Sequence, residues 1–167
     1  MKKPSRKTKK IRLAIVGTGG MANVHAEEFL KEKDVSLVAV CDVSAERARE
    51  FTAKHSPGTT VFTDFAELLR VANPDAVANV TPDKLHAPLT LQAIAAGCHV
   101  FCEKPLATNY ADAAKMVRAA KRAGVINMVN FSYRNAPAIQ MARELVARGA
   151  LGEIVHLEAS YLQSWLT

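Results

Sequence analysis

A glycine-rich turn between a predicted strand and a predicted helix constrains this chain more than any other feature. Residues 13–16 form a continuous apolar run, Leu-Ala-Ile-Val, which is typical of a parallel strand covered on both faces. The run ends at Gly17, and the pattern Gly17-x-Gly19-x-x-Ala22 leads into an alanine-rich helical stretch. A dinucleotide-binding turn lies at this point between a strand and a helix, so the order predicts one here.

Each small residue of this turn has a physical use. Gly17 permits the tight turn, Gly19 has no Cβ to keep a pyrophosphate from the backbone, and Ala22 lets the helix pack closely on the strand. Free amides at the start of the helix would then meet the phosphate charge. The turn residues that we expect to contact the cofactor are Gly17, Thr18, Gly19, Gly20 and Met21.

An acidic residue follows the second predicted strand, which spans residues 35–41. Asp42 lies twenty residues beyond Ala22, where a carboxylate accepts hydrogen bonds from an adenosine ribose. Because a carboxylate repels a 2′-phosphate, we expect NAD rather than NADP. Arg47, one helical turn into the next helix, argues the other way. The alternative interpretation is a glycine turn and a helix-capping aspartate in another kind of α/β protein.

Strands and helices alternate with short links over the first 131 residues. The predicted strands are about 11–16, 35–41, 61–62, 75–80, 99–102 and 125–131, and the predicted helices about 20–32, 44–55, 65–71, 85–96 and 108–123. This alternation predicts an α/β fold with a doubly wound parallel sheet of Rossmann type and strand order 3-2-1-4-5-6. Its ligand crevice would lie at the carboxyl ends of the strands.

The pattern changes after residue 131. A helix is predicted over 137–147, and residues 153–162 alternate, with Val155, Leu157 and Tyr161 on one face. Such alternation indicates a half-exposed strand of a mostly antiparallel sheet. We therefore expect a basic tail at 1–10, a dinucleotide-binding domain at 11–131, and a truncated second α+β domain at 132–167. The unpaired strand would favour a homo-oligomer.

The net charge of +6 arises entirely from the first ten residues, which hold six basic side chains and no acid. The remainder has sixteen basic and sixteen acidic residues, so we expect no nucleic-acid surface. A solvated arm is preferred over a polyanion-binding one. No apolar run is long enough to cross a membrane.

The three cysteines, Cys41, Cys98 and Cys102, fall on predicted strands and show no metal-ligand spacing. Buried reduced thiols in a cytoplasmic protein are the expectation, with no bound metal.

Several segments together resemble the Gfo/Idh/MocA family (glucose-fructose oxidoreductase, inositol dehydrogenase and rhizopine catabolism) from residue 11 to the end. The matching segments are Ile15–Ala22, Cys41-Asp42, Thr81-Pro82-Asp83-Lys84-Leu85-His86, Phe101-Cys102-Glu103-Lys104-Pro105-Leu106-Ala107 and Gly149-x-Leu151-Gly152-Glu153-Ile154. The Glu-Lys-Pro element is the most specific of them.

The resemblance implies an NAD- or NADP-dependent oxidoreductase acting on a sugar, cyclitol or related polyol. It places Lys104 beside the nicotinamide as the catalytic residue, where it would hydrogen-bond the oxygen that gains charge as hydride leaves. It also implies a cis Lys104–Pro105 peptide. The alternative is a lysine that caps the strand end or meets Glu103.

The same resemblance assigns further residues to the cofactor site. Thr81 and Pro82 would shape the loop over the cofactor, and Glu103 would meet ribose hydroxyls or backbone amides of the crevice. His86 could face the nicotinamide, although a local hydrogen bond at the surface is as good an interpretation.

The chain departs from the family at its carboxyl end. Family members continue through a second domain that carries an Asp and a His for substrate binding and proton abstraction, and no residue here can take those roles. The chain is then the amino-terminal part of a dehydrogenase or a non-catalytic dinucleotide-binding module. A methyltransferase has a similar turn and acid, but Glu103-Lys104-Pro105 argues against it.

Overall fold

The computed structural model describes residues 10–162 of the 167. The predicted basic tail therefore lies outside the described residues, except for Lys10. The described residues divide between Asn130 and Phe131 into two compact units, and each is described by itself.

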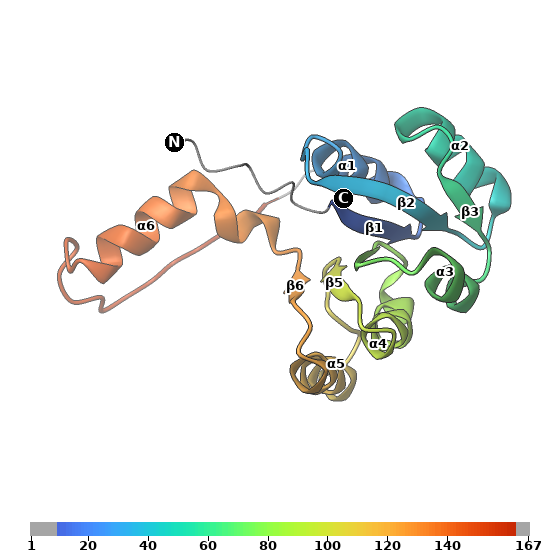
Figure 1. Ribbon diagram of the computed structural model, residues 1–167. Helices are drawn as coiled ribbons and strands as arrows, with labels where there is room; N and C mark the ends of the chain where they lie inside the picture. Colours follow the sequence, from blue (N-terminus) through green and yellow to red (C-terminus); the bar gives the residue numbers. More distant parts are fainter. Residues whose placement is uncertain (1–9, 163–167) are drawn as a thin grey trace, which may run out of the picture. The chain divides into compact units, whose positions relative to one another are not determined.

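The first unit is a single parallel sheet of six strands in the order β3-β2-β1-β4-β5-β6, which confirms the predicted Rossmann topology (Figure 1). Its strands are β1 (Ile11–Val16), β2 (Val35–Cys41), β3 (Thr60–Phe62), β4 (Ala76–Asn79), β5 (His99–Cys102) and β6 (Asn127–Val129). Its helices are α1 (Gly20–Phe29), α2 (Ala45–His55), α3 (Phe65–Ala72), the 3-10 turn η1 (Asp83–Leu85), α4 (His86–Ala95) and α5 (Tyr110–Ala123).

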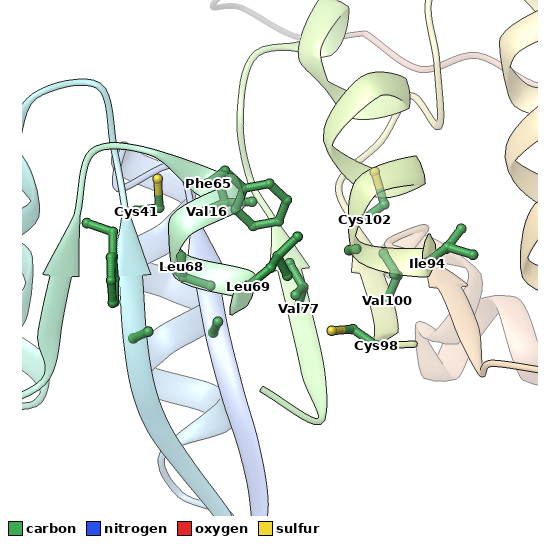
Figure 2. Packing of buried hydrophobic residues seen from close by; sticks show 14 of the residues in the cluster. Val16, Cys41, Phe65, Leu68, Leu69, Val77, Ile94, Cys98, Val100 and Cys102 are labelled. Atoms are coloured by element: carbon green, nitrogen blue, oxygen red, sulfur yellow. The ribbon is translucent and has the colours of Figure 1, made fainter. Parts of the chain in front are cut away.

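Helices cover both faces of this sheet, with α1 and α2 on one face and α3, α4 and α5 on the other (Figure 1). Strand β1 is buried from both sides because its successive side chains point to opposite faces. Leu13 and Ile15 join the cluster under α1 and α2, whereas Ala14 and Val16 join the larger cluster that includes Leu68 of α3. Figure 2 shows that larger cluster. The two cores hold the carboxyl ends of the central strands rigidly at one edge.

Side-chain caps set where several helices begin. Ser44 accepts a hydrogen bond from the amide of Arg47 at the start of α2, and Asp64 accepts one from Glu67 at the start of α3. Helix α5 begins at Tyr110, slightly later than predicted, because Asn109 and not Thr108 supplies its cap. Helix α1 ends at Phe29, three residues before the predicted end.

The second unit contains the 3-10 turn η2 (Ser132–Asn135) and α6 (Pro137–Ala147). The strand predicted over 153–162 is wrong, because the structure has neither helix nor strand there. A strand is held by backbone hydrogen bonds to a neighbour, and none lies beside this segment within residues 10–162. The alternating apolar side chains remain exposed, Val155 by 89% and Leu157 by 78%.

Candidate functional site

The carboxyl ends of four central strands lie in register at one edge of the sheet. Val16 at the end of β1 pairs with Cys41 of β2 on one side and Asn79 of β4 on the other, and Asn79 pairs with Cys102 of β5. The residues that follow these strands, among them Gly17 and Asp42, therefore meet in one place. This edge is where open α/β sheets bind their ligands.

The turn after β1 depends on Gly17. Its φ of +87° is the left-handed region, and a Cβ there would lie 2.7 Å from the carbonyl oxygen of Val80. By contrast, a Cβ at Gly19 or Gly20 would meet no atom within 4 Å, so space lies open in front of the turn. Helix α1 has no side-chain cap at its start, which leaves backbone amides there free for an anion.

Asp42 lies directly beside this turn, and its buried carboxylate is held by four donors. Oδ2 accepts from the amide and the hydroxyl of Thr18, at 2.9 and 2.8 Å. Oδ1 accepts from the amide of Ser44 at 2.9 Å and from Nη2 of Arg47 at 2.8 Å. Burial alone would raise the pKa of Asp42, but these hydrogen bonds outweigh it and lower the pKa from 3.8 to about 2. The carboxylate is therefore ionised at neutral pH.

A hollow of about 350 Å³ opens next to Asp42. Its walls are mostly apolar, and a flat heteroaromatic ring suits such a site. The lining residues are Val16, Gly17, Cys41, Asp42, Val43, Arg47, Thr63, Asp64, Phe65, Thr81, Pro82, Leu85 and Leu89. Both Thr81 and Pro82 thus lie beside the Gly17 turn and Asp42.

The loop after β4 is fixed from within by the fully buried Asn79. Its Oδ1 accepts from the amide and hydroxyl of Thr81, and its Nδ2 donates to the carbonyl of His86 and to Thr90. Sequence reasoning missed Asn79. An asparagine within an otherwise apolar buried strand is the signal that could have found it.

His86 does not line this edge, and the idea that its ring faces a cofactor is wrong. The ring is completely buried, with Nδ1 2.6 Å from the carbonyl oxygen of Pro105 and Nε2 2.8 Å from that of Thr81. It joins the loop after β4 to the loop after β5. The alternative prediction, a local hydrogen bond made by His86, agrees better with the structure. The residue nevertheless lies in the interior and not at the surface.

Glu103, at the end of β5, is also buried and faces inward. Its Oε1 lies 2.5 Å from Nε2 of His25 and accepts from Asn130 at 2.6 Å, while Oε2 accepts from the amide of Lys104 at 3.0 Å. Burial raises the pKa of Glu103, but the hydrogen bonds from Asn130, His25 and Lys104 have the larger combined effect and lower it. We predicted that Glu103 would meet either ribose hydroxyls or backbone amides. The structure shows the second kind of contact, with the amide of Lys104.

Sequence reasoning missed His25 as part of this cluster. It lies on the inner face of α1 with Ala22 and Ala26, at the spacing of three and four residues that marks a buried stripe. A histidine within such a stripe requires a polar partner, and that requirement was the available signal.

Lys104 follows Glu103 and differs from it in exposure. Its side chain is exposed, and its ammonium has no hydrogen bond or ion pair with any residue of the described range 10–162. The Lys104–Pro105 peptide is cis, as the resemblance implied. The exposed ammonium of Lys104 thus lies at the end of β5, and Glu103 holds the backbone amide of the same residue in place.

Residues 10–162 show neither a metal site nor a membrane-spanning helix. They hold no group of three or more His, Cys, Asp or Glu side chains placed to bind a metal ion. In the same range, no helix has the length and apolar character required to cross a membrane.

Comparison with known proteins gives consistent matches. A family model, GFO_IDH_MocA, described as an oxidoreductase family with an NAD-binding Rossmann fold, matches residues 11–131. The D-glucoside 3-dehydrogenase of Escherichia coli (strain K12) is 38% identical over 86% of this chain and 41% of its own length. The myo-inositol 2-dehydrogenase of Thermotoga maritima is 33% identical over 86% of this chain and 42% of its own.

Solved structures agree. The scyllo-inositol dehydrogenase from Lactobacillus casei, with bound NAD(H) and scyllo-inositol, superposes with a TM-score of 0.80 at 28% identity, over 87% of this chain and 43% of that one. The myo-inositol 2-dehydrogenase from Lactobacillus plantarum gives 0.80 at 29% identity, over 88% and 44%. The chain therefore spans less than half the length of these relatives.

Proposed function

Because this chain belongs to the Gfo/Idh/MocA family of oxidoreductases with an NAD-binding Rossmann fold, we propose that it is the cofactor-binding part of an enzyme that moves hydride between NAD and a sugar, cyclitol or related polyol. One observation carries the proposal. The Gly17 turn and the Asp42 carboxylate follow neighbouring strands, and Thr18 within the turn donates two hydrogen bonds to that carboxylate. An amide-rich turn beside an anionic acceptor suits a pyrophosphate joined to a ribose.

Each part of the cofactor is assigned to residues whose chemistry suits it. The backbone amides of Gly19, Gly20 and Met21 would receive the pyrophosphate, whereas the amides of Gly17 and Thr18 donate to the Cys41 carbonyl and to Asp42 and shape the turn. Asp42 would accept from the adenosine ribose, and the apolar hollow bounded by Thr81 and Pro82 would hold the adenine. Bound NAD supplies the ring that accepts or returns hydride. The acidic residue at position 42 supports NAD over NADP.

Lys104 is the residue to which we assign the catalytic contact. Its free ammonium can donate a hydrogen bond to a substrate hydroxyl oxygen, and this bond strengthens as negative charge develops there. Glu103 holds the Lys104 amide from behind and is assigned a positioning role rather than a ribose contact. We assign no general base within this chain.

The polyol class is supported by what the similar proteins are called. Their names are those of dehydrogenases of glucosides and inositols. These compounds carry secondary hydroxyls on a ring, which is the group that hydride transfer to NAD converts into a ketone.

We also propose that the protein works in the cytoplasm, as its cysteines suggest. Cys41, Cys98 and Cys102 are free and buried, and burial, the main cause, raises the pKa of Cys41 and of Cys102 to about 11. Thiols of this kind stay protonated. They form no disulfide, and reduced cysteines are typical of proteins in the cytoplasm.

Self-association through residues 153–162 remains our proposal for the assembly. The segment exposes Val155, Leu157, Tyr161 and Leu162 by 65% or more, and a strand from a second copy would pair its backbone. Native mass spectrometry should find a dimer or larger species that Leu157→Asp dissociates. A monomer at micromolar concentration would contradict the proposal.

Titration with NADH, followed by its fluorescence, tests the function. We expect saturable binding that Asp42→Ala weakens about tenfold or more. Reduction of NAD with a panel of glucosides and inositols is expected of the enzyme of which this chain is the cofactor-binding part, and its absence there would favour the non-catalytic module. An absence of saturable binding would refute the cofactor assignment itself.

A further inference from the structure

Glu103 and Lys104 are neighbours of opposite charge, yet their charged groups do not meet. The side chain of Glu103 is buried, with an exposure of 8%, whereas that of Lys104 is exposed. The Lys104 ammonium makes no hydrogen bond or ion pair within the described part of the chain. An ion pair with Glu103 would occupy the ammonium that the proposed reaction requires. The contacts that turn the Glu103 carboxylate inward therefore bear on whether Lys104 can act.

Two side chains from distant parts of the sequence hold the carboxylate in this orientation. Oε1 of Glu103 lies 2.5 Å from Nε2 of His25 and accepts from Nδ2 of Asn130 at 2.6 Å. Burial raises the pKa of Glu103, but its hydrogen bonds lower it by more, so the group is ionised at neutral pH and can only accept. Nε2 of His25 is therefore the donor in their contact.

Aromatic packing fixes the ring of His25 on its other sides. The ring centroid lies 5.0 Å from that of Phe101, with the two rings edge-on, and 6.1 Å from that of Phe29. Phe29 and Phe101 also meet edge-on, with centroids 5.3 Å apart. Aromatic pairs favour this arrangement. The ring cannot turn without breaking these contacts, so Nε2 stays directed at Glu103.

Because Oε1 is held in this way, Oε2 of Glu103 meets the backbone of the next residue. It accepts from the amide of Lys104 at 3.0 Å. The amide of Glu103 donates in turn to the carbonyl of Asn79, also at 3.0 Å. The backbone on the amino side of Lys104 is thus fixed, while its side chain is left without a partner.

We propose that His25 and Asn130 are positioning residues for Lys104, which act by holding Glu103 against the Lys104 amide and away from the Lys104 ammonium. This inference rests on the proposed function, because it takes Lys104 as the catalytic residue. Without the two donors, the carboxylate can turn outward and pair with the adjacent ammonium. The ammonium would then be neutralised, and the amide would lose its acceptor.

Hydrogen exchange of the Lys104 amide, followed by NMR in the chain without cofactor, tests the proposal. The exchange rate reports the contact with Glu103, and the amide of Ile15, in the buried strand β1, reports global unfolding. In His25→Leu, exchange at Lys104 should accelerate about tenfold or more relative to Ile15, the change that loss of a hydrogen bond to a charged group implies. His25→Gln should stay within about threefold of the wild type, because its side-chain amide can still donate to Glu103.

His55→Leu is the matched control. His55 also packs on a phenylalanine, Phe51, and its Nε2 lies 2.7 Å from Oδ1 of Asn23. The control should change the ratio of the Lys104 and Ile15 exchange rates by less than about twofold, since it removes no contact of Glu103.

Equal acceleration at Lys104 and Ile15 in His25→Leu would mean that His25 only stabilises the fold, and the proposal would be wrong. Asn130→Leu is the second variant, at a partly exposed position, should His25→Leu fail to fold. It removes the other donor to Oε1 and should also accelerate exchange at Lys104 relative to Ile15. An unchanged ratio in Asn130→Leu would overturn the proposal.

Turnover tests the consequence for catalysis, in the enzyme of which this chain is the cofactor-binding part. His25→Leu should lower kcat for NAD-linked polyol oxidation about tenfold and leave KM for NAD within about threefold, because a misplaced catalytic group slows the reaction itself. His25→Gln should restore most of kcat. Faster exchange at Lys104 with an unchanged kcat would refute the positioning role. A wild-type chain that binds no NADH would instead refute the proposed function, and the exchange result, obtained without cofactor, separates the two failures.

Discussion

Nε2 of His25 lies 2.5 Å from Oε1 of Glu103, although 78 residues separate the two in the chain. Both side chains are buried, and the His25 ring also packs edge-on against Phe101 with ring centroids 5.0 Å apart. The contact joins α1, whose start forms the proposed pyrophosphate site, to the residue that precedes Lys104. The two parts of the proposed site are therefore held to each other through the interior.

We expect Glu103→Gln to lower the free energy of unfolding by about 1–3 kcal/mol, because the amide turns a donor toward partners that are themselves donors. Urea denaturation measures the change. Glu28→Gln is the control, since Glu28 is 65% exposed and pairs with Lys31 at the surface, and it should cost at most about 0.5 kcal/mol. If the two variants lose the same free energy of unfolding, the buried contact of Glu103 stabilises the fold no more than the surface ion pair does.

Acid should weaken the fold partly through Asp42. Its pKa is about 2 in the folded chain and 3.8 when unconstrained, so its contribution is complete above about pH 5 and is lost as the pH falls through 3.8 toward 2. The contribution is on the order of 2 kcal/mol. The difference in unfolding free energy between the wild type and Asp42→Asn should be constant above pH 5 and shrink below pH 4. A difference independent of pH down to 2 would contradict this.

Gly17→Ala should both destabilise the fold and abolish NADH binding, because the new Cβ would lie 2.7 Å from the Val80 carbonyl oxygen. Gly124→Ala provides the comparison: Gly124 also has positive φ, at +66°, but a Cβ there meets open space. That variant should lose only the conformational cost of about 1–2 kcal/mol and keep binding. If Gly17→Ala and Gly124→Ala lose similar stability, the clash between the new Cβ at position 17 and the Val80 carbonyl oxygen is not the cause of the destabilisation.

Lys104→Met should leave NADH affinity within about threefold and reduce turnover by a factor of about 10² or more, because it removes a donor required as charge develops. NAD-linked oxidation of the most active polyol, by the enzyme of which this chain is the cofactor-binding part, measures turnover. Lys84→Met, at another exposed lysine near this edge, should retain activity. An unchanged rate in Lys104→Met would remove Lys104 from the chemistry.

Local sequence was sufficient for the strand order, the turn and most caps. The apolar run ending at Gly17, the acid after β2 and the cap at Asp64 each depend on neighbours within a few residues, where sterics and short-range hydrogen bonds decide the conformation. The sheet order then follows from the handedness of the crossovers. For this reason the order of strands and helices over residues 11–131 could be predicted from the sequence.

Tertiary structure alone decided the roles of the buried polar residues and of the last segment. Whether His86 meets a ligand or two backbone carbonyls, and whether Glu103 meets a ribose or His25, depends on which loops the sheet brings together. The alternation in residues 153–162 describes a face but provides no neighbouring strand to pair with. Local pattern encodes which conformations a segment can adopt, whereas the partner that stabilises one of them is set by packing between residues far apart in the chain.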